Sequence, residues 1–286
     1  MAISKSNTLK HIKFNHWVAA HGVSATRNFD KDMPRLIFTC AYDGTAWRGW
    51  QSQAGGMTLQ DAIEDAFAGI LRTRIRINAS GRTDAGVHAI AQVFHADVPE
   101  ACRMTPQNWR AALNAHLDGT IRIMEVRPAE SDFHARFSAK GKIYEYLIST
   151  APVLSPFMMN RAWHCPHGID VKKLAEALAC YQGEHDFRRF AAKRGNEPEP
   201  APADYYIRHI YSAEVEEAEQ GCLLRLRFYG NGFMYRMVRM LTGAAVKVAC
   251  GKMSIAELQH LLAVPDGPKN RHCAPAEGLY LKQVFY

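Results

Sequence analysis

Segments with the two-residue periodicity of strands alternate with single helix-like segments along residues 35–286. In the first helix-like segment, apolar residues recur every three to four positions from Leu59 to Leu71, and Thr58 is placed to cap it. Strands are expected at 35–42, 74–77, 92–98, 121–126, 142–148, 207–215, 223–229 and 279–286. Further helices are expected at 105–117, after Asp170, at 234–250 and after Ser254. Strands separated by single helices, in two similar halves, predict an α+β protein with antiparallel sheets flanked by helices.

These two halves set the expected domain organisation. Residues 34–136 are predicted to form an N-terminal subdomain, and residues 137–286 a C-terminal subdomain. Residues 1–33 contain several basic side chains but no sustained periodicity, which predicts a peripheral N-terminal extension. The stretch 195–203 is rich in proline and is predicted to be a loop.

Composition and spacing exclude several classes of protein. Hydrophobic residues make up 48% of the 286 residues, which predicts a folded chain. No apolar run approaches the ~18 residues of a membrane span, and the N-terminus lacks the apolar core of a secretory signal. We therefore expect a cytoplasmic protein without a membrane partner. The seven cysteines form no C-x-x-C pair, and His164-Cys165-Pro166-His167 has no second ligand pair, so no metal site is expected.

The chain is basic, with 35 Lys and Arg against 28 Asp and Glu and a formal net charge of +7. Basic side chains displace the counterions that condense on phosphates, so this excess favours a polyanionic partner. A solvated basic surface would give the same excess without any such partner.

The segment 80–89, SGRTDAGVHA, is the densest in residues with chemical potential. Gly81 and Gly86 allow a sharp bend between two predicted strands, and Asp84 lies at its middle. A carboxylate on such a loop is presented rather than buried, which suits a nucleophile or a general base. Asp84 could instead accept hydrogen bonds from loop amides, the ordinary role of Asp in a turn. The residues alone allow both interpretations.

Residues 81–89, GRTDAGVHA, closely resemble the signature of the TruA family of tRNA pseudouridine synthases, whose Asp is the catalytic residue. Other family motifs are matched in family order at 42–44 with 49–51, 133–140 followed by Tyr144 and Tyr146, 183–187, 233–239 and 278–281. The resemblance runs from about residue 35 to 286 and leaves out residues 1–33 and the proline-rich loop. It implies the pseudouridine synthase fold, with two similar subdomains and a central basic cleft.

The resemblance also implies an activity, namely isomerisation of uridine to pseudouridine in the anticodon stem-loop of tRNA, at positions 38, 39 and 40. The bond between uracil N1 and ribose C1′ breaks and the base rejoins through C5, which needs no metal or cofactor. Asp84 is then the nucleophile. A carboxylate is compatible with attack on the sugar, attack on the base, or promotion of a glycal. Family members are homodimers, so a homodimer bound to tRNA is expected.

The resemblance implies a charged partner for Asp84. Arg239 matches the family arginine that keeps the catalytic carboxylate ionised in a partly desolvated cleft. From the residues alone Arg239 could be a surface charge on a helix. The stretch around it is apolar, however, so an arginine there needs a partner.

Three further residues match family positions in the substrate pocket. Tyr144 matches the aromatic residue that stacks on the flipped base, and its hydroxyl is a candidate for removing the C5 proton, although a strand tyrosine is commonly core. Arg82 matches the arginine that holds the displaced nucleotide and its phosphates. Leu279 matches the residue of the pocket floor, a role that any strand leucine would fit. Motif histidines such as His88 are expected to make structural hydrogen bonds.

Contacts with RNA beyond the pocket are expected from basic side chains, namely Arg72, Arg74, Arg76, Arg136, Lys140, Lys142, Arg188, Arg189, Lys193 and Arg194. The extension 1–33 could serve as a basic arm. The first alternative is a non-catalytic tRNA-binding or chaperone protein on the same fold, in which Asp84 has no special role. The second is a pseudouridine synthase with another RNA target. A small-molecule hydrolase is a third, but its nucleophile elbow and metal motif are missing from the sequence.

Overall fold

The computed structural model describes residues 34–166, 168–195 and 197–286, so the predicted extension 1–33 lies outside the described residues. Residues Pro34–Tyr286 form one compact unit. The boundary between subdomains at residue 136 stays a prediction. No helix of the described residues combines the length and the hydrophobicity that a bilayer span requires.

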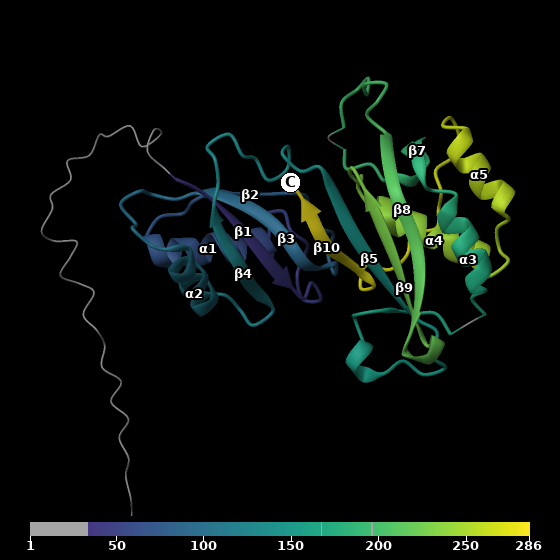
Figure 1. The fold of residues 1–286 in the computed structure, drawn as a ribbon, viewed down its shortest axis with the longest axis horizontal. Coiled ribbons are helices and arrows are strands. Elements are labelled where there is room, and N and C mark those ends of the chain that lie inside the picture. The colour runs from purple at the N-terminus through teal and green to yellow at the C-terminus, as the bar shows by residue number, and fades with distance from the viewer. Residues whose placement is uncertain (1–33, 167, 196) are drawn as a thin grey trace, which may run out of the picture. The chain divides into compact units, whose positions relative to one another are not determined.

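Ten strands of the described residues form one sheet (Figure 1). Its order is β4-β1-β3-β10-β5-β9-β8-β7, and two short strands join it at the side, β2 on β3 and β6 on β5. The strands are β1 (Arg35–Tyr42), β2 (Ile77–Ala79), β3 (His88–Asp97), β4 (Ile121–Pro128), β5 (Gly141–Ser149), β6 (Trp163–His164), β7 (Gly183–Asp186), β8 (Ile207–Ala218), β9 (Leu223–Gly230) and β10 (Leu279–Phe285).

Most neighbouring strands pair antiparallel, as the sequence predicts. The C-terminal strand β10 pairs antiparallel with β5 on one side and parallel with β3 on the other. The two halves of the chain therefore share one sheet instead of forming a sheet each. The reason is that β10 pairs with β5 along Leu279–Phe285 and with β3 at Tyr280 and Leu281, so its backbone donors and acceptors bind both halves.

Five α-helices are described, in two groups (Figure 1). In the first half α1 (Leu59–Leu71) contacts α2 (Pro106–His116), which packs on β4. In the second half α3 (Val171–Ala179), α4 (Met237–Ala249) and α5 (Ile255–Ala263) contact one another, and α3 packs on β8. Short 3₁₀ helices occur at η1 (Pro156–Met158), η2 (Arg188–Phe190) and η3 (Glu219–Gly221).

The start of α1 is the one that the sequence predicts. The Thr58 side chain accepts a hydrogen bond from the backbone N–H of Asp61, and Leu59, Ile63 and Phe67 are fully buried. Burying side chains of this size stabilises the fold by about 1.5–3 kcal/mol each.

Strands β6 and β7 were not predicted, and several boundaries differ from the prediction, such as the start of β3 at His88 and not at 92. Two of these differences have a clear physical reason. Strand β2 starts at Ile77 and not at 74, because the Arg74 side chain turns to α1 and binds Glu64 and Asp61, each at 3.1 Å. Helix α4 starts at Met237 and not at 234, because Arg236 has a left-handed backbone with φ 59°. A right-handed helix cannot continue through a residue with a left-handed backbone, so the helix begins at the next residue.

Candidate active site

Asp84 lies on the loop between β2 and β3, which hydrogen bonds hold in place. The backbone N–H of Trp50 donates to the carbonyl of Thr83 at 3.0 Å. The hydroxyls of Tyr42 and Thr83 are hydrogen-bonded at 2.8 Å in the interior. The backbone N–H of Val87 donates to the carbonyl of Asp84 at 3.1 Å, which closes the turn. The carboxylate is therefore carried on a fixed backbone.

Two glycines that the sequence analysis did not single out allow the neighbouring loop to pack on this turn. A Cβ at Gly49 would lie 2.8 Å from the carbonyl oxygen of Thr83, and Gly49 has φ +93°. A Cβ at Gly44 would lie 2.1 Å from the carbonyl oxygen of Val87. Both distances are shorter than real Cβ contacts, so only glycine fits. The matched segments 42–44 and 49–51 contain these glycines, and close backbone approach is the physical reason for them.

Asp84 and Arg239 form an ion pair between residues 155 positions apart. Arg239 Nη1 donates to Asp84 Oδ2 at 2.9 Å, and the two side chains are 14% and 15% exposed. Arg239 Nε also donates to the carbonyl of Ala274 at 2.8 Å, which fixes the plane of the guanidinium. The guanidinium offsets the cost of burying the negative charge of the carboxylate.

Tyr144 and Leu279 line the same cleft as Asp84. The Tyr144 ring is 8% exposed and meets the ring of Phe233 edge-to-face at 5.2 Å. Burial, and then the negative charge of Asp84, raises the pKa of the Tyr144 phenol well above its usual range. The hydroxyl is thus a hydrogen-bond donor at neutral pH, which favours stacking and donation over removal of a proton. Leu279 is 6% exposed and contributes apolar wall from β10.

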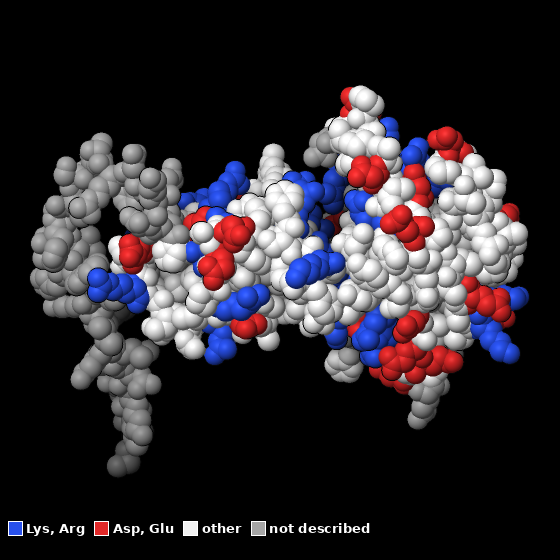
Figure 2. Space-filling model, turned by 45° about the horizontal axis from the view of Figure 1, so that its top comes forward, with Lys and Arg blue, Asp and Glu red and all other residues white. Residues whose placement is uncertain are grey.

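The cleft has a volume of about 1080 Å³ and a strongly basic lining. Its cationic residues are Arg76, Arg82, Arg136, Lys142, Arg194, Arg208 and Arg236, against the acidic Asp84 and Glu197. Figure 2 shows basic side chains gathered in the middle of one face of the molecule. Phosphate groups are the natural ligands of such a lining.

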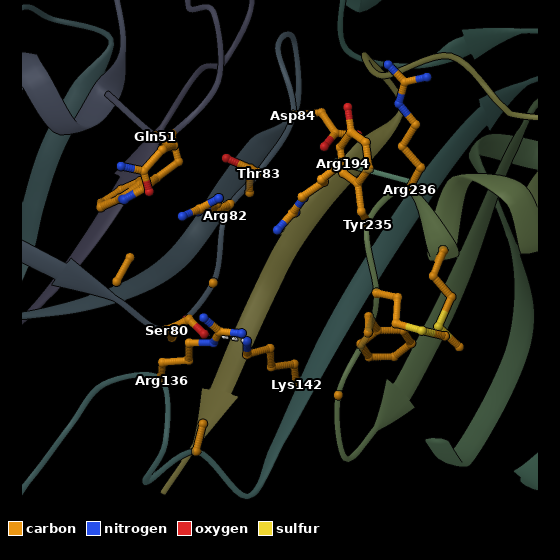
Figure 3. A pocket seen from close by; sticks show the side chains of 18 of the residues that line it. Gln51, Ser80, Arg82, Thr83, Asp84, Arg136, Lys142, Arg194, Tyr235 and Arg236 are labelled. Carbon is orange, nitrogen blue, oxygen red and sulfur yellow. Dashed lines mark hydrogen bonds between the residues drawn. The ribbon is translucent and has the colours of Figure 1, made fainter. Parts of the chain in front are cut away.

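Arg82 is exposed and lies within this row of cations (Figure 3). Burial, and then the charges of Arg194 and Arg136, lowers the pKa of the Arg82 guanidinium. No carboxylate of the described residues lies within 4.0 Å of it. The side chain is therefore available to an external anion, in keeping with a role in holding phosphates.

The cleft also contains Tyr235 and Arg236, to which the sequence analysis assigned no role. The guanidinium groups of Arg194 and Arg236 lie over the Tyr235 ring, 4.5 and 5.1 Å from its centre. Tyr235 and Arg236 belong to the matched segment 233–239, of which only Arg239 was given a function. The match to this segment could therefore have identified Tyr235 and Arg236 as candidate site residues.

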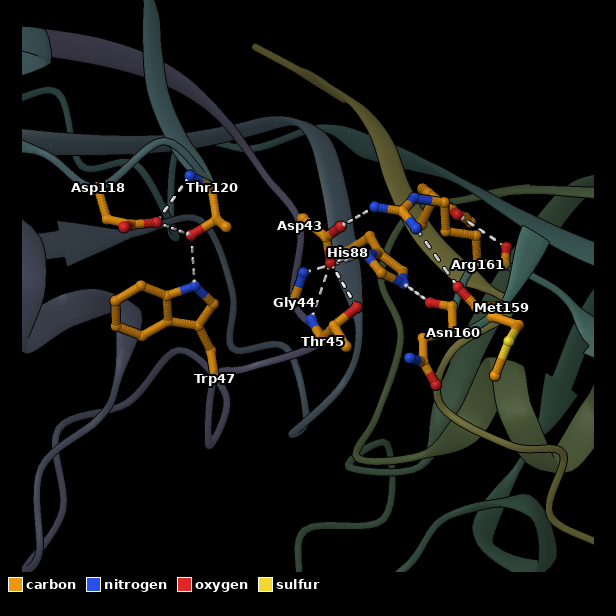
Figure 4. A network of polar contacts seen from close by, with 11 residues as sticks. Asp43, Gly44, Thr45, Trp47, His88, Asp118, Thr120, Met159, Asn160 and Arg161 are labelled. Atoms are coloured by element: carbon orange, nitrogen blue, oxygen red, sulfur yellow. Dashed lines mark hydrogen bonds and ion pairs between the residues drawn. The ribbon is translucent and has the colours of Figure 1, made fainter. Parts of the chain in front are cut away.

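A polar network fastens the far end of the Asp84 loop (Figure 4). His88 is 2% exposed, and its Nδ1 accepts from the backbone N–H of Gly44 at 3.0 Å. Its Nε2 therefore carries the proton and donates to the carbonyl of Asn160 at 2.9 Å. Next to Asn160, Arg161 forms an ion pair with Asp43, with 2.6 Å between Nη2 and Oδ2. The ion pair connects this segment to the loop that follows β1. His88 thus makes structural hydrogen bonds.

Known proteins resemble this chain over most of its length. A family model described as tRNA pseudouridine synthase matches residues 39–138 and 177–286. A tRNA pseudouridine synthase A of Akkermansia muciniphila is 49% identical over 255 residues, which are 89% of this chain and 96% of the relative. Proteins of the same description from Geobacillus kaustophilus and Geobacillus sp. (strain WCH70) are 41% and 39% identical, over 88% of this chain and 94% and 98% of theirs.

Proposed function

The chain belongs to the tRNA pseudouridine synthase family, and from that premise we propose that it isomerises uridines 38, 39 and 40 in the anticodon stem-loop of tRNA with Asp84 as the nucleophile. As a member of this family it is an isomerase that makes pseudouridine in tRNA. The identity of the nucleophile and the choice of uridines are the new parts of the proposal.

The reaction conserves all atoms of the nucleotide. The bond between N1 and C1′ breaks, the base turns while it stays bound, and a bond forms between C5 and C1′. C5 then loses its proton and N1 ends protonated, so no electron donor or acceptor takes part. The enzyme has to supply a charged nucleophile, a pocket that holds the free base, and contacts that keep the nucleotide out of its helix.

The contact between Asp84 and Arg239 is the observation that carries this proposal. The carboxylate of Asp84 is paired with a cation from α4 and lies in a cleft whose other charged groups are almost all cations and which the ring of Tyr144 also lines. A carboxylate with only a turn-forming role would not need an arginine from α4. The alternative of a non-catalytic tRNA-binding protein gives this ion pair no function.

Replacing Asp84 by Asn tests the proposal, because the change removes the charge and nearly keeps the volume. With tRNA carrying tritium at uridine C5, formation of the new bond releases the label into water. We expect Asp84→Asn to slow this release by at least ~10³-fold, as for loss of a nucleophile, and to bind tRNA normally.

The matched control is Asp65→Asn, since the Asp65 side chain is 67% exposed on α1 and lies outside the cleft. Normal tritium release by Asp84→Asn would refute the role of Asp84. Sequencing of the modified uridines in tRNA from cells with and without the protein tests positions 38, 39 and 40 separately.

We further propose that the protein acts as a homodimer in the cytoplasm. The segment 151–161 supports the dimer, because it exposes 82% of Val153, 85% of Phe157 and 55% of Met159. Large exposed apolar side chains gathered in one short segment are typical of a surface that a partner covers.

A further inference from the structure

Lys142 is a cation that the fold leaves with unused hydrogen-bonding capacity. It belongs to β5, is partly buried in the wall of the cleft, and donates from Nζ to the carbonyl of Ser80 at 2.6 Å. An ammonium group has three N–H donors. Among the described residues no carboxylate lies within 4.0 Å of Lys142, and no second acceptor binds it. Burial, and then the charge of Arg136, lowers the pKa of Lys142 to about 8.

A second cation lies next to this ammonium. Arg136 is exposed on the loop between β4 and β5, and Figure 3 shows it beside Lys142 and Ser80. Within the described chain its guanidinium makes no hydrogen bond or ion pair, and it lies over the Phe137 ring, 5.5 Å from the ring centre. Two neighbouring cations repel each other, and this arrangement becomes favourable once an anion lies between them.

The place of this pair relative to Asp84 indicates which anion it takes. Lys142 and Tyr144 project from the same face of β5, about 7 Å apart along the strand. Ser80, which Lys142 holds, begins the loop that carries Asp84. A group bound by Lys142 and Arg136 is therefore a close neighbour of a nucleotide stacked on Tyr144. In an RNA chain, the anionic neighbour of a nucleotide is a backbone phosphate.

We propose that Lys142 and Arg136 form a subsite for one backbone phosphate adjoining the target uridine. The subsite rests on the proposed function, because it assumes an RNA strand in the cleft. It assigns these two side chains to one particular linkage rather than to diffuse attraction between the protein and RNA. The competing explanation is that Lys142 serves only to hold the Ser80 carbonyl and the loop that follows.

Neutralising one phosphate at a time separates these explanations. Anticodon stem-loop RNAs with a single methylphosphonate on either side of the target uridine are bound to the wild-type protein, to Lys142→Met and to Arg136→Gln. We expect one linkage at which the wild-type protein loses about tenfold in affinity. At that linkage both variants, already weakened, lose nothing more. Lys142→Arg keeps the charge and should keep the tenfold sensitivity.

The control is Lys173→Met, on α3 outside the cleft, which should retain the full wild-type sensitivity at every linkage. If at every linkage the methylphosphonate weakens binding by the same factor in Lys142→Met, in Arg136→Gln and in the wild-type protein, the subsite does not exist. Arg136→Gln keeps this test valid even if Lys142→Met disturbs the loop, because the Arg136 side chain makes no hydrogen bond to the described residues.

Binding is measured without turnover, so the result stands whether or not Asp84 is the nucleophile. Tritium release by the wild-type protein, measured in parallel on the unmodified RNA, reports on the proposed function alone. If tritium release is normal but no linkage substitution has a smaller effect in the variants than in the wild-type protein, the subsite is refuted and the proposed function is not.

Discussion

At the scale of single residues, Asp84 and Tyr144 are held in different ways. The carboxylate of Asp84 has a fixed partner in Arg239, whereas the Tyr144 hydroxyl makes no hydrogen bond with the described residues. Packing alone, against Phe233 and the rest of the wall, positions the Tyr144 ring. Its hydroxyl is therefore free for a ligand, and removal of that hydroxyl takes no contact away from the folded protein.

We predict that Tyr144→Phe lowers kcat about tenfold, which corresponds to one lost hydrogen bond, and leaves KM and the melting temperature unchanged. Tritium release and thermal denaturation check this. Tyr146→Phe is the matched control, since the Tyr146 hydroxyl donates to the carbonyl of Pro275 at 2.7 Å. That variant should lose about 1 kcal/mol of stability and bind tRNA normally. An unchanged kcat in Tyr144→Phe would show that the hydroxyl takes no part in the reaction and that Tyr144 acts only through the packing of its ring.

At the scale of elements, the loop that carries Arg136 is held by hydrogen bonds from strand β3, from strand β1 and from the C-terminal residue Tyr286. The backbone N–H of Ala135 donates to Nδ1 of His95 on β3 at 3.1 Å. Arg35, on β1, donates a hydrogen bond to the carbonyl of Phe133 at 2.7 Å, and the Tyr286 hydroxyl donates one to the carbonyl of Ala135 at 2.9 Å. The bond to His95 requires a neutral imidazole, because a protonated Nδ1 has no lone pair to accept.

This requirement predicts a pH dependence of stability. Burial, and then the charges of Arg35 and His134, lowers the pKa of His95 from 6.5 to about 4. Well above pH 6.5 neither the folded nor the unfolded state is protonated there, and the contribution of His95 to stability is fully present. Between pH 6.5 and about 4 only the unfolded state takes up the proton, so stability falls as the pH falls.

Urea unfolding at pH 7 and at pH 5 measures this loss. His95→Asn places an acceptor oxygen near the position of Nδ1 and does not titrate, so its stability should fall less between the two pH values. Other histidines contribute to the total slope, and the difference between the two proteins isolates His95. Parallel curves for wild type and His95→Asn contradict the prediction.

At the scale of the whole molecule, the sheet joins both halves of the chain through β10, and the cleft draws its lining from both. Asp84 and Arg82 come from the first half, and Tyr144 and Leu279 from the second. Arg239, also from the second half, binds Asp84. The exposed apolar segment 151–161 is outside this lining, so a partner that covers it leaves the cleft open to RNA.

We predict that the protein is a dimer in solution and that Val153→Ser with Phe157→Ser raises its dissociation constant at least about tenfold, because large exposed apolar side chains carry much of an interface's energy. Sedimentation equilibrium measures the change. Phe137→Ser is the control, since Phe137 is 75% exposed but lies in the cleft. A monomeric wild-type protein, or a double variant as dimeric as Phe137→Ser, would exclude this surface as the interface.

Local features of the chain could be predicted from the sequence. The apolar periodicity of α1 and its Thr58 cap, and the glycine-flanked loop of Asp84, depend on residues a few positions apart. The tRNA pseudouridine synthase family was predicted from its motifs, and the family model and the relatives confirm it. Boundaries were less accurate at β2 and α4, where the side chain of Arg74 and the backbone of Arg236 follow tertiary contacts rather than local periodicity.

The sequence by itself determined the order of most strands and helices, though not β6 and β7, and the presence of the family motifs, because periodicity and short motifs act over neighbouring residues. Only the tertiary structure decided that β10 lies between β3 and β5, since a strand's own pattern does not say which edge it will pair with. Only the tertiary structure brings Arg239 within 2.9 Å of Asp84 and places Lys142 beside Arg136. Charges this far apart in the chain meet through the packing of the elements that carry them.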